Sequence, residues 1–272
     1  MPRTDTLKVP GAGLYHEVRG TGPVLLLICG GSSDAGIFTG LADALADHYT
    51  VVSYDPRGNS RSPFDGPAYD QSIEVHADDA HRLLAHVTDS PALVFGSSSG
   101  ALAGLELLVT HPEQVRGLVA HEPPGVRLLP DAAEHLAFFE SVYETYRRDG
   151  VEAGMRLFGA GVGMDGPSGP PPPPETMPTL QRMLGNTELF LAHEVRQFPR
   201  YLPDAGALAA LPGRLVLAGG AASRAHLPYR PALALAGTLG LELVDFPGDH
   251  IGYLGHPVEF AAQLTEVLGR FG

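Results

Sequence analysis

Basic residues are scarce in this sequence, and their scarcity excludes one class of partner. The 272 residues include 18 Lys and Arg against 31 Asp and Glu, which gives a formal net charge of −13, and Lys8 is the single lysine. Proteins that bind nucleic acid or anionic membrane surfaces need clusters of basic side chains. We therefore expect neither nucleic acid nor a membrane as a partner.

Cysteine and long apolar runs are also nearly absent. Cys29 stands alone, so an internal disulfide and a cysteine-based zinc cluster are both excluded. No apolar run reaches the roughly 20 residues of a membrane-spanning helix. Residues 1–6 lack the apolar segment of a signal peptide. These absences favour a cytoplasmic protein, and its 44% of hydrophobic residues are enough for a sizeable core.

Short apolar runs alternate with helical patterns before residue 123 and again after residue 211. Continuous apolar runs predict buried strands, and apolar residues that recur every three or four positions predict helices. Their alternation predicts a doubly wound, mostly parallel sheet, which binds ligands beyond the carboxyl ends of its strands. The expected strands are residues 6–9, 13–18, 24–28, 49–54, 92–95, 115–121, 215–218 and 241–246, and the expected helices are residues 38–47, 73–87, 101–110, 229–239 and 260–268.

The strand pattern stops between residues 123 and 211. Because it resumes afterwards, we interpret this stretch as a helical insertion into a core formed by residues 1–122 and 212–272. A proline-rich stretch inside it, residues 167–178, reads as a stiff extended loop that cannot enter a helix. The expected helices of the insertion are residues 131–148, 151–158 and 187–198.

The sequence Gly96-Ser-Ser-Ser-Gly100 joins an expected strand to an expected helix. A Gly-x-Ser-x-Gly turn in this setting is the nucleophile-elbow arrangement, in which the central serine is exposed at the strand tip. Gly96 and Gly100 leave room for the sharp turn, and the backbone N–H of Ser99 at the helix start favours a developing negative charge. A plain Ser/Gly loop is the alternative, and the flanking strand and helix disfavour it. Ser98 is therefore the candidate nucleophile.

Five features together resemble the α/β-hydrolase fold over nearly the whole chain. They are the elbow, the Gly30-Gly31 pair, the turn Asp55–Gly58, the inserted helices and the late Gly248-Asp249-His250. The resemblance implies a mostly parallel sheet of about eight strands with the insertion as a helical cap. It also implies a small-molecule substrate, no cofactor, and His250 as the base that activates Ser98. Arg57 within the turn resembles a residue that braces the sheet.

The resemblance further implies an oxyanion hole, formed by the backbone N–H groups of Gly31 and Ser99. The family's His-Gly pair reads Cys29-Gly30 in this chain. We interpret Cys29 as a small buried filler, with a reactive thiol as the alternative.

The acid that orients the histidine departs from the family pattern. It usually follows the strand expected at residues 215–218, but residues 219–241 contain no Asp or Glu. Ser223 falls near that place, although a serine cannot stabilise an imidazolium with a charge. Glu122 follows the preceding strand and keeps the order Ser, acid, His, so we favour Glu122 over Ser223. Asp245 and Asp249 are weaker candidates.

The sequence shows no metal-binding motif and no phosphate or dinucleotide fingerprint. His76, His81 and His86 share one expected helix without a His-Glu-x-x-His pattern, and we expect them to be solvated. We therefore predict no metal site.

The insertion carries most of the methionines and several phenylalanines. Such side chains suit an adaptable apolar wall, so we expect a medium-sized, largely apolar substrate. Most of them are expected in the core of the cap and a minority at the pocket, and the side on which His193 and Glu194 lie is left open. The residues are Met155, Met164, Met177, Met183, Phe138, Phe139, Phe158, Phe190 and Phe198.

The leading functional hypothesis is a serine hydrolase, of the carboxylesterase or thioesterase kind, that forms an acyl-enzyme on Ser98. One alternative is cofactor-free chemistry on the same scaffold, such as carbon–carbon bond cleavage by a lyase or a cyclase step. Another is a non-catalytic ligand-binding protein. Dehalogenase and epoxide-hydrolase activities are disfavoured, because those relatives need a carboxylate nucleophile where this chain has Ser98.

Overall fold

An eight-stranded sheet forms the centre of the computed structural model, which describes residues 2–164 and 176–272. The strand order is β1-β2-β4-β3-β5-β6-β7-β8. The pairs β1–β2 and β2–β4 are antiparallel, and every other pair is parallel. The expectation of a mostly parallel sheet is thereby confirmed. The strands are β1 (Arg3–Val9), β2 (Ala12–Arg19), β3 (Val24–Ile28), β4 (Thr50–Tyr54), β5 (Ala92–Ser97), β6 (Val115–His121), β7 (Leu215–Gly220) and β8 (Leu243–Phe246).

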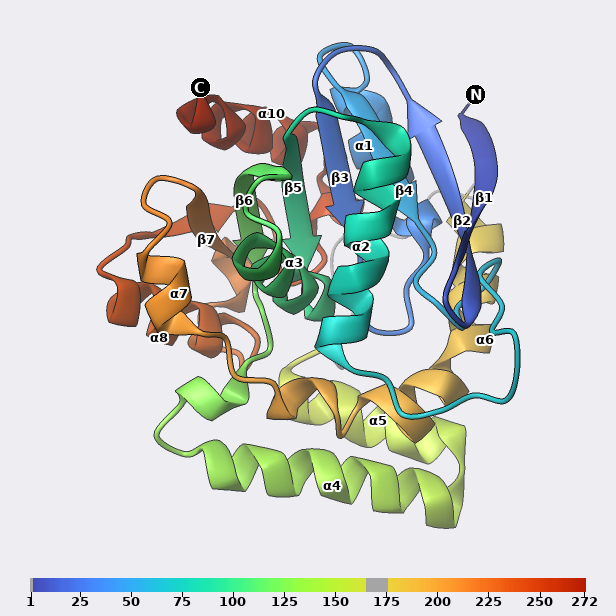
Figure 1. Cartoon of the computed structure of the whole chain (residues 1–272). Helices are drawn as coiled ribbons and strands as arrows, with labels where there is room; N and C mark the ends of the chain where they lie inside the picture. Colours follow the sequence, from blue (N-terminus) through green and yellow to red (C-terminus); the bar gives the residue numbers. More distant parts are fainter. Residues whose placement is uncertain (1, 165–175) are drawn as a thin grey trace.

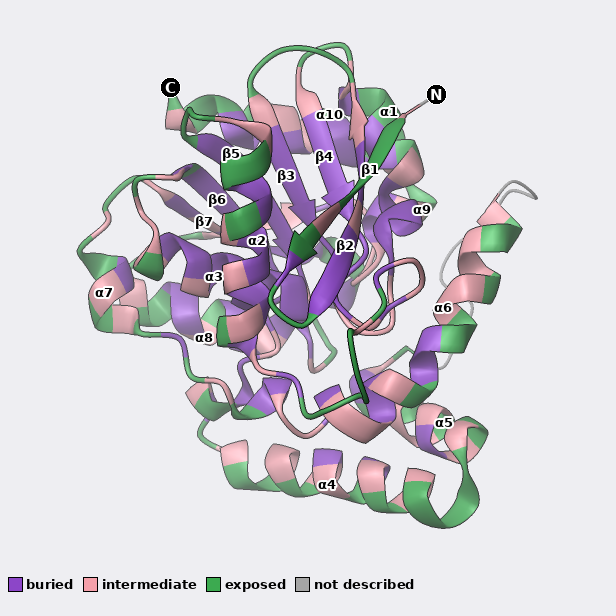
Figure 2. Ribbon diagram, turned by 45° about the vertical axis from the view of Figure 1, so that its right-hand side comes forward, coloured by how far each residue is buried: buried purple, intermediate pink, exposed green. Residues whose placement is uncertain are grey.

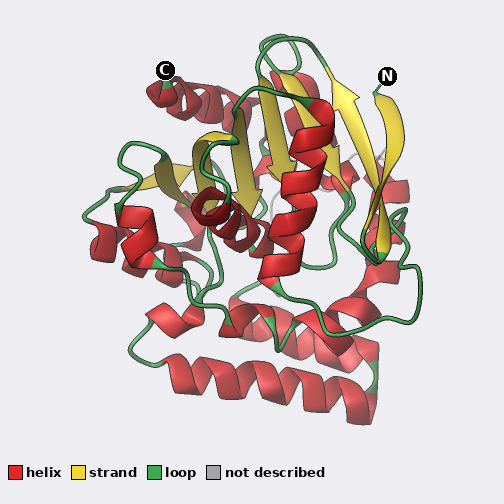
Figure 3. Cartoon of the chain, viewed as in Figure 1, coloured by secondary structure: helices red, strands yellow, loops and turns green. Residues whose placement is uncertain are grey.

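Helices cover both faces of the sheet (Figure 1, Figure 3). Helices α2 (Ile73–Val87), α3 (Ser99–Thr110) and α8 (Tyr229–Leu239) pack on one face, and α1 (Thr39–Leu45) and α10 (Pro257–Leu268) pack on the other. The central strands are therefore buried on both sides, as Figure 2 shows, which explains why they read as continuous apolar runs. The short helix α7 (Ala205–Ala209) packs on the first of these faces, and α9 (Gly252–Gly255) packs on the second.

The segment between β6 and β7 lies beyond the carboxyl ends of the parallel strands (Figure 1). It contains α4 (Ala132–Asp149), α5 (Val151–Val162), α6 (Met177–Leu189) and a π-helical turn, η4 (Phe190–Glu194). These elements have a hydrophobic cluster of their own, and α4 turns an exposed side to solvent (Figure 2). The division into a core and a cap at residues 123 and 211 stays a prediction.

Two expectations about this segment were wrong. Pro178 does not lie in an extended loop, because it occupies the first turn of α6, where a missing N–H group costs no intrahelical hydrogen bond. The remainder of the expected loop, residues 167–175, is outside the described residues. The expected helix 187–198 is also not continuous. It is divided among the end of α6, the turn η4 and a 3₁₀ turn at Phe198–Arg200.

One histidine of α2 also differs from expectation. His76 is 8% exposed, and its ring meets that of Phe198 edge-on at 5.1 Å between centroids. It is therefore a buried side chain, because it lies on the face of α2 that also carries Ile73 and Ala77.

Among the residues that the structure describes, no helix is long and apolar enough to cross a membrane.

Candidate active site

Ser98 occupies a strained turn between β5 and α3. Its backbone angles, φ 56° and ψ −128°, lie in a region that residues with a side chain rarely adopt. A Cβ atom at Gly96 would collide with the backbone of Gly100, and one at Gly100 would collide with the carbonyl of Ile28. Both glycines are therefore required by close backbone contacts, which is the steric condition that a nucleophile elbow imposes.

Glu122 and His250 meet at the same edge of the sheet. Glu122 directly follows β6, is fully buried and has φ 48°, while His250 lies in the loop after β8. Nδ1 of His250 donates to Oε2 of Glu122 at 2.6 Å, and the N–H of Gly220 donates to Oε1 at 2.8 Å. Because an ionised carboxylate only accepts, the proton of a neutral His250 resides on Nδ1 and leaves Nε2 free to accept one.

The environment of Glu122 favours its charged form. Burial raises the pKa of Glu122, but the hydrogen bond from His250, the charges of His250 and His121, and the N–H of Gly220 outweigh burial. The net pKa of Glu122 is therefore below its ordinary value, and the carboxyl is ionised at neutral pH.

The other candidate acids have different partners. Ser223 is buried just after β7, and within residues 2–164 and 176–272 its hydroxyl makes no hydrogen bond to His250. Oδ1 of Asp249 accepts from the N–H of Ile251 at 3.0 Å. Asp245 pairs with Arg224 and accepts from the Tyr229 hydroxyl. Glu122 is thus the carboxylate that contacts the histidine.

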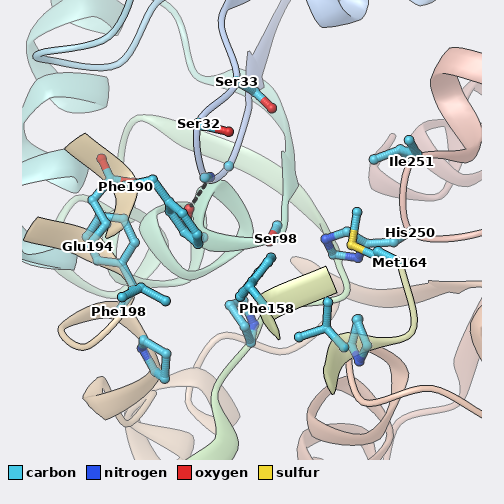
Figure 4. A pocket seen from close by; sticks show the side chains of 18 of the residues that line it. Ser32, Ser33, Ser98, Phe158, Met164, Phe190, Glu194, Phe198, His250 and Ile251 are labelled. Carbon is cyan, nitrogen blue, oxygen red and sulfur yellow. Dashed lines mark hydrogen bonds between the residues drawn. The ribbon is translucent and has the colours of Figure 1, made fainter. Parts of the chain in front are cut away.

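The Gly31 loop lies directly against the elbow. The N–H of Gly31 donates to Oγ of Ser99 at 2.9 Å, the dashed bond in Figure 4. A Cβ atom at Gly30 would come within 2.6 Å of Cβ of Ser98 and 2.8 Å of the backbone nitrogen of Ser99. The two predicted oxyanion donors are therefore brought together, and the hydroxyl of Ser99 already accepts from one of them. Sequence reasoning missed this hydroxyl.

A cavity of about 260 Å³ lies between the inserted helices and the sheet edge, and both Ser98 and His250 line it. No hydrogen bond joins these two side chains in the part of the chain that the structure describes. Most of the wall is apolar, and the methionines and phenylalanines contribute more of it than expected, because α4, α5, α6, η4 and the 3₁₀ turn after η4 all direct apolar side chains toward the sheet edge. Those that line the cavity are Met155, Met164, Met183, Phe139, Phe158, Phe190 and Phe198, whereas Met177 and Phe138 do not line it.

Glu194 is a polar exception in this wall. It lines the cavity and is 1% exposed, and neither carboxyl oxygen has a hydrogen-bond partner among the described residues. Burial raises the pKa of Glu194 to about 8. His193 instead points away and contacts Asp70 through Nδ1 at 3.0 Å. Glu194 therefore faces the cavity, and His193 faces away from it.

Cys29 and Arg57 lie in the core of the protein. Cys29 is 3% exposed, and burial raises the pKa of its thiol well above the ordinary value, so the reactive thiolate is disfavoured. The guanidinium of Arg57 pairs with the carboxylate of Asp79, and both side chains are buried. The interpretations of Cys29 as a filler and of Arg57 as a structural residue agree with these positions.

Three side chains outside the cavity are close enough to share a metal ion. The ligand atoms of Asp5, His16 and His86 all lie within 4.8 Å of one another. Asp5 and His16 are paired across β1 and β2, and His86 comes from α2. The expectation that no metal constellation exists considered only motifs along the chain, and it missed a group that strand pairing assembles. None of the three lines the cavity.

The parallel sheet, the elbow at Ser98 and the histidine after the last strand define an α/β-hydrolase. A family model described as the alpha/beta hydrolase fold matches residues 23–160. The uncharacterized hydrolase YraK of Bacillus subtilis is 40% identical over 97% of this chain and 96% of its own length. The chain belongs to the α/β-hydrolase family.

Further relatives are also hydrolases. A zearalenone hydrolase of Bionectria ochroleuca is 28% identical and matches over 98% of both chains. The structure of a thermophilic esterase from Thermogutta terrifontis has a TM-score of 0.75 at 21% identity and covers 100% of this chain and 99% of its own. At that identity the esterase supports the fold alone. The relatives together support hydrolase activity for this chain.

Proposed function

We propose that this protein is a serine hydrolase that cleaves an ester or thioester of a medium-sized, largely apolar substrate. The observation that carries the proposal is the hydrogen bond between Glu122 and His250 in a cavity that also contains the strained Ser98. A serine, a histidine and a buried carboxylate in these roles form the triad of acyl-transfer enzymes. The apolar wall of the cavity supports the substrate class.

In this mechanism Oγ of Ser98 attacks the carbonyl carbon, and Nε2 of His250 accepts the serine proton. Glu122 stabilises the imidazolium that forms. The N–H groups of Ser99 and Gly31 stabilise the oxyanion, which takes the place of the Ser99 hydroxyl at Gly31. His250 then protonates the leaving alcohol or thiol, and water, activated by the same histidine, releases the acid from Ser98.

The inserted helices serve this chemistry as a cap. The side chains of α5, α6 and η4 close the cavity on the side opposite the sheet. Exclusion of water from such a site strengthens the electrostatic stabilisation of the oxyanion. The name of the Bionectria ochroleuca relative describes it as a hydrolase of zearalenone, which further supports a hydrolytic rather than a carbon–carbon bond reaction.

A fluorophosphonate probe and a panel of p-nitrophenyl esters test the proposal together. The wild-type protein should be labelled and should hydrolyse esters with short to medium acyl chains, whereas Ser98→Ala should do neither. Labelling without hydrolysis of any ester or acyl thioester would favour non-hydrolytic chemistry. A folded wild-type protein that is not labelled would favour ligand binding without catalysis and would overturn the proposal.

A further inference from the structure

Glu194 is a buried polar side chain for which the described part of the protein provides no partner. It is the last residue of the π-helical turn η4, and both of its carboxyl oxygens are buried without a hydrogen bond among the described residues. Buried polar groups in folded proteins are nearly always paired, so an unpaired one needs an explanation. Because Glu194 faces a cavity rather than a packed core, a ligand in that cavity can supply the missing partner.

The surroundings of Glu194 favour an uncharged carboxyl. Burial raises the pKa of Glu194 to about 8, and within the described residues burial alone accounts for this shift. The charge of an ionised Glu194 would raise the pKa of the buried Cys29 thiol further, and that thiol is held neutral by its own burial. A protonated carboxyl has one O–H donor and retains a carbonyl acceptor, so it suits a neutral oxygen group better than a cation.

The position of Glu194 selects one part of the substrate. Figure 4 places Glu194 and His250 on opposite sides of Ser98. His250 protonates the leaving group in the mechanism above, so the leaving group lies on the side of His250. The acyl part then extends toward Glu194, past Phe190, whose ring lies 3.8 Å from where a Cβ atom of Gly31 would stand.

We propose that the carboxyl of Glu194 binds a hydroxyl or ketone oxygen carried on the otherwise apolar acyl part of the substrate. This inference rests on the proposed function and narrows its substrate class to hydroxyacyl or oxoacyl esters. A site with a buried hydrogen-bonding group discriminates against analogues that lack the matching group, because its own group is then left unpaired.

Matched pairs of p-nitrophenyl esters test the inference. Each pair consists of a straight-chain ester and the same ester with one ketone or hydroxyl oxygen, and the oxygen is moved along the chain from one pair to the next. For the best-placed oxygen, the wild-type kcat/KM should exceed that of the plain ester at least tenfold. Glu194→Leu should reduce this ratio to about one, and Glu194→Gln should keep part of it, because an amide also donates. His193→Ala, which changes the neighbour that faces Asp70, should keep the full ratio.

A ratio that survives Glu194→Leu at every oxygen position would overturn the inference. A preference of the wild-type protein for an amine-bearing ester, lost in Glu194→Gln, would overturn it in favour of an ionised carboxylate that binds a cation. Calorimetric binding of the same esters to Ser98→Ala tests the inference about Glu194 independently of the proposed reaction. If Ser98→Ala binds the oxygenated ester more tightly and the added Glu194→Leu change abolishes that preference, the inference stands even where the chemistry differs. Equal binding of both esters would contradict it.

Discussion

Nδ1 of His250 and Oε2 of Glu122 lie 2.6 Å apart, although 128 residues separate them in the sequence. The contact forms because β6 lies inside the sheet and its carboxyl end meets the loop after β8 at one edge. The N–H of Gly220, at the end of β7, fixes the second carboxyl oxygen. Three neighbouring strands thus hold the proposed acid and base in register.

Replacement of the proposed acid should lower turnover strongly. Glu122→Gln keeps the shape of the side chain but removes its charge, and its amide can present a donor to Nδ1, which favours the wrong histidine tautomer. We expect kcat for the best ester to fall between about 10²- and 10⁴-fold, with a small change in KM. Ser223→Ala is the matched control and should stay within a few-fold of wild type. A larger loss in Ser223→Ala than in Glu122→Gln would reverse the assignment.

The backbone at position 98 provides a test that does not depend on the substrate. Ser98→Ala and Ser98→Gly both remove the hydroxyl, but only glycine adopts φ 56° with ψ −128° without strain. We expect Ser98→Gly to be more stable than Ser98→Ala by about 1 kcal/mol in chemical denaturation. Both variants should be inactive. Equal stability of the two variants would show that the elbow stores no strain.

The parts of the fold that the sequence predicted well depend on local patterns. The bounds expected for α2, β6 and α8 agree with those observed, because amphipathic periodicity and apolar runs are properties of neighbouring residues. The elbow was identified for the same reason, because both glycines that its close contacts require lie within five consecutive residues. The choice between Glu122 and Ser223 remained open because it depends on which strand ends meet His250, and that is set by sheet order.

The orientation of Glu194 shows a different limit of prediction from the sequence. A regular helix was expected over residues 187–198, and its period would define which side chains share a face. The π-helical turn at Phe190–Glu194 adds a residue to one turn and so changes the face that each later side chain occupies. Nothing in the residue pattern indicates this irregularity. The Asp5, His16 and His86 group was missed for a related reason, because pairing of distant strands and helix packing bring it together.

The hydroxyl of Ser99 should compete with the oxyanion for the N–H of Gly31. The hydrogen bond from Gly31 to Ser99 Oγ must break before that N–H can stabilise the proposed tetrahedral intermediate, and such a bond contributes about 1 kcal/mol. Ser99→Ala removes the competitor and keeps its own backbone N–H. We therefore expect kcat/KM to rise by a factor of about two to ten, measured with the best p-nitrophenyl ester. A 100-fold decrease would instead mean that the hydroxyl itself supports the loop or contacts the substrate.

The pH dependence of folding should reveal the buried carboxyl of Glu194. Its pKa rises from the ordinary 4.5 to about 8 in the folded protein, so the unfolded chain loses this proton at lower pH than the folded one does. The stability associated with the proton is therefore complete below about pH 4.5 and is lost as the pH rises toward about 8. Glu194→Gln has no such proton to lose.

Urea denaturation of wild type and Glu194→Gln between pH 5 and pH 9 measures this difference. The free energy of unfolding of the variant should rise by several kcal/mol relative to that of wild type between pH 5 and about pH 8, and the difference should stay constant from there to pH 9. The buried His76 and His121, whose pKa values fall to about 3 and about 4, act in the opposite sense, because stability is lost as the pH falls below 6.5. Both proteins share these histidines, so their effect cancels in the difference. A difference that does not change with pH would mean that Glu194 is ionised in the folded protein at ordinary pH.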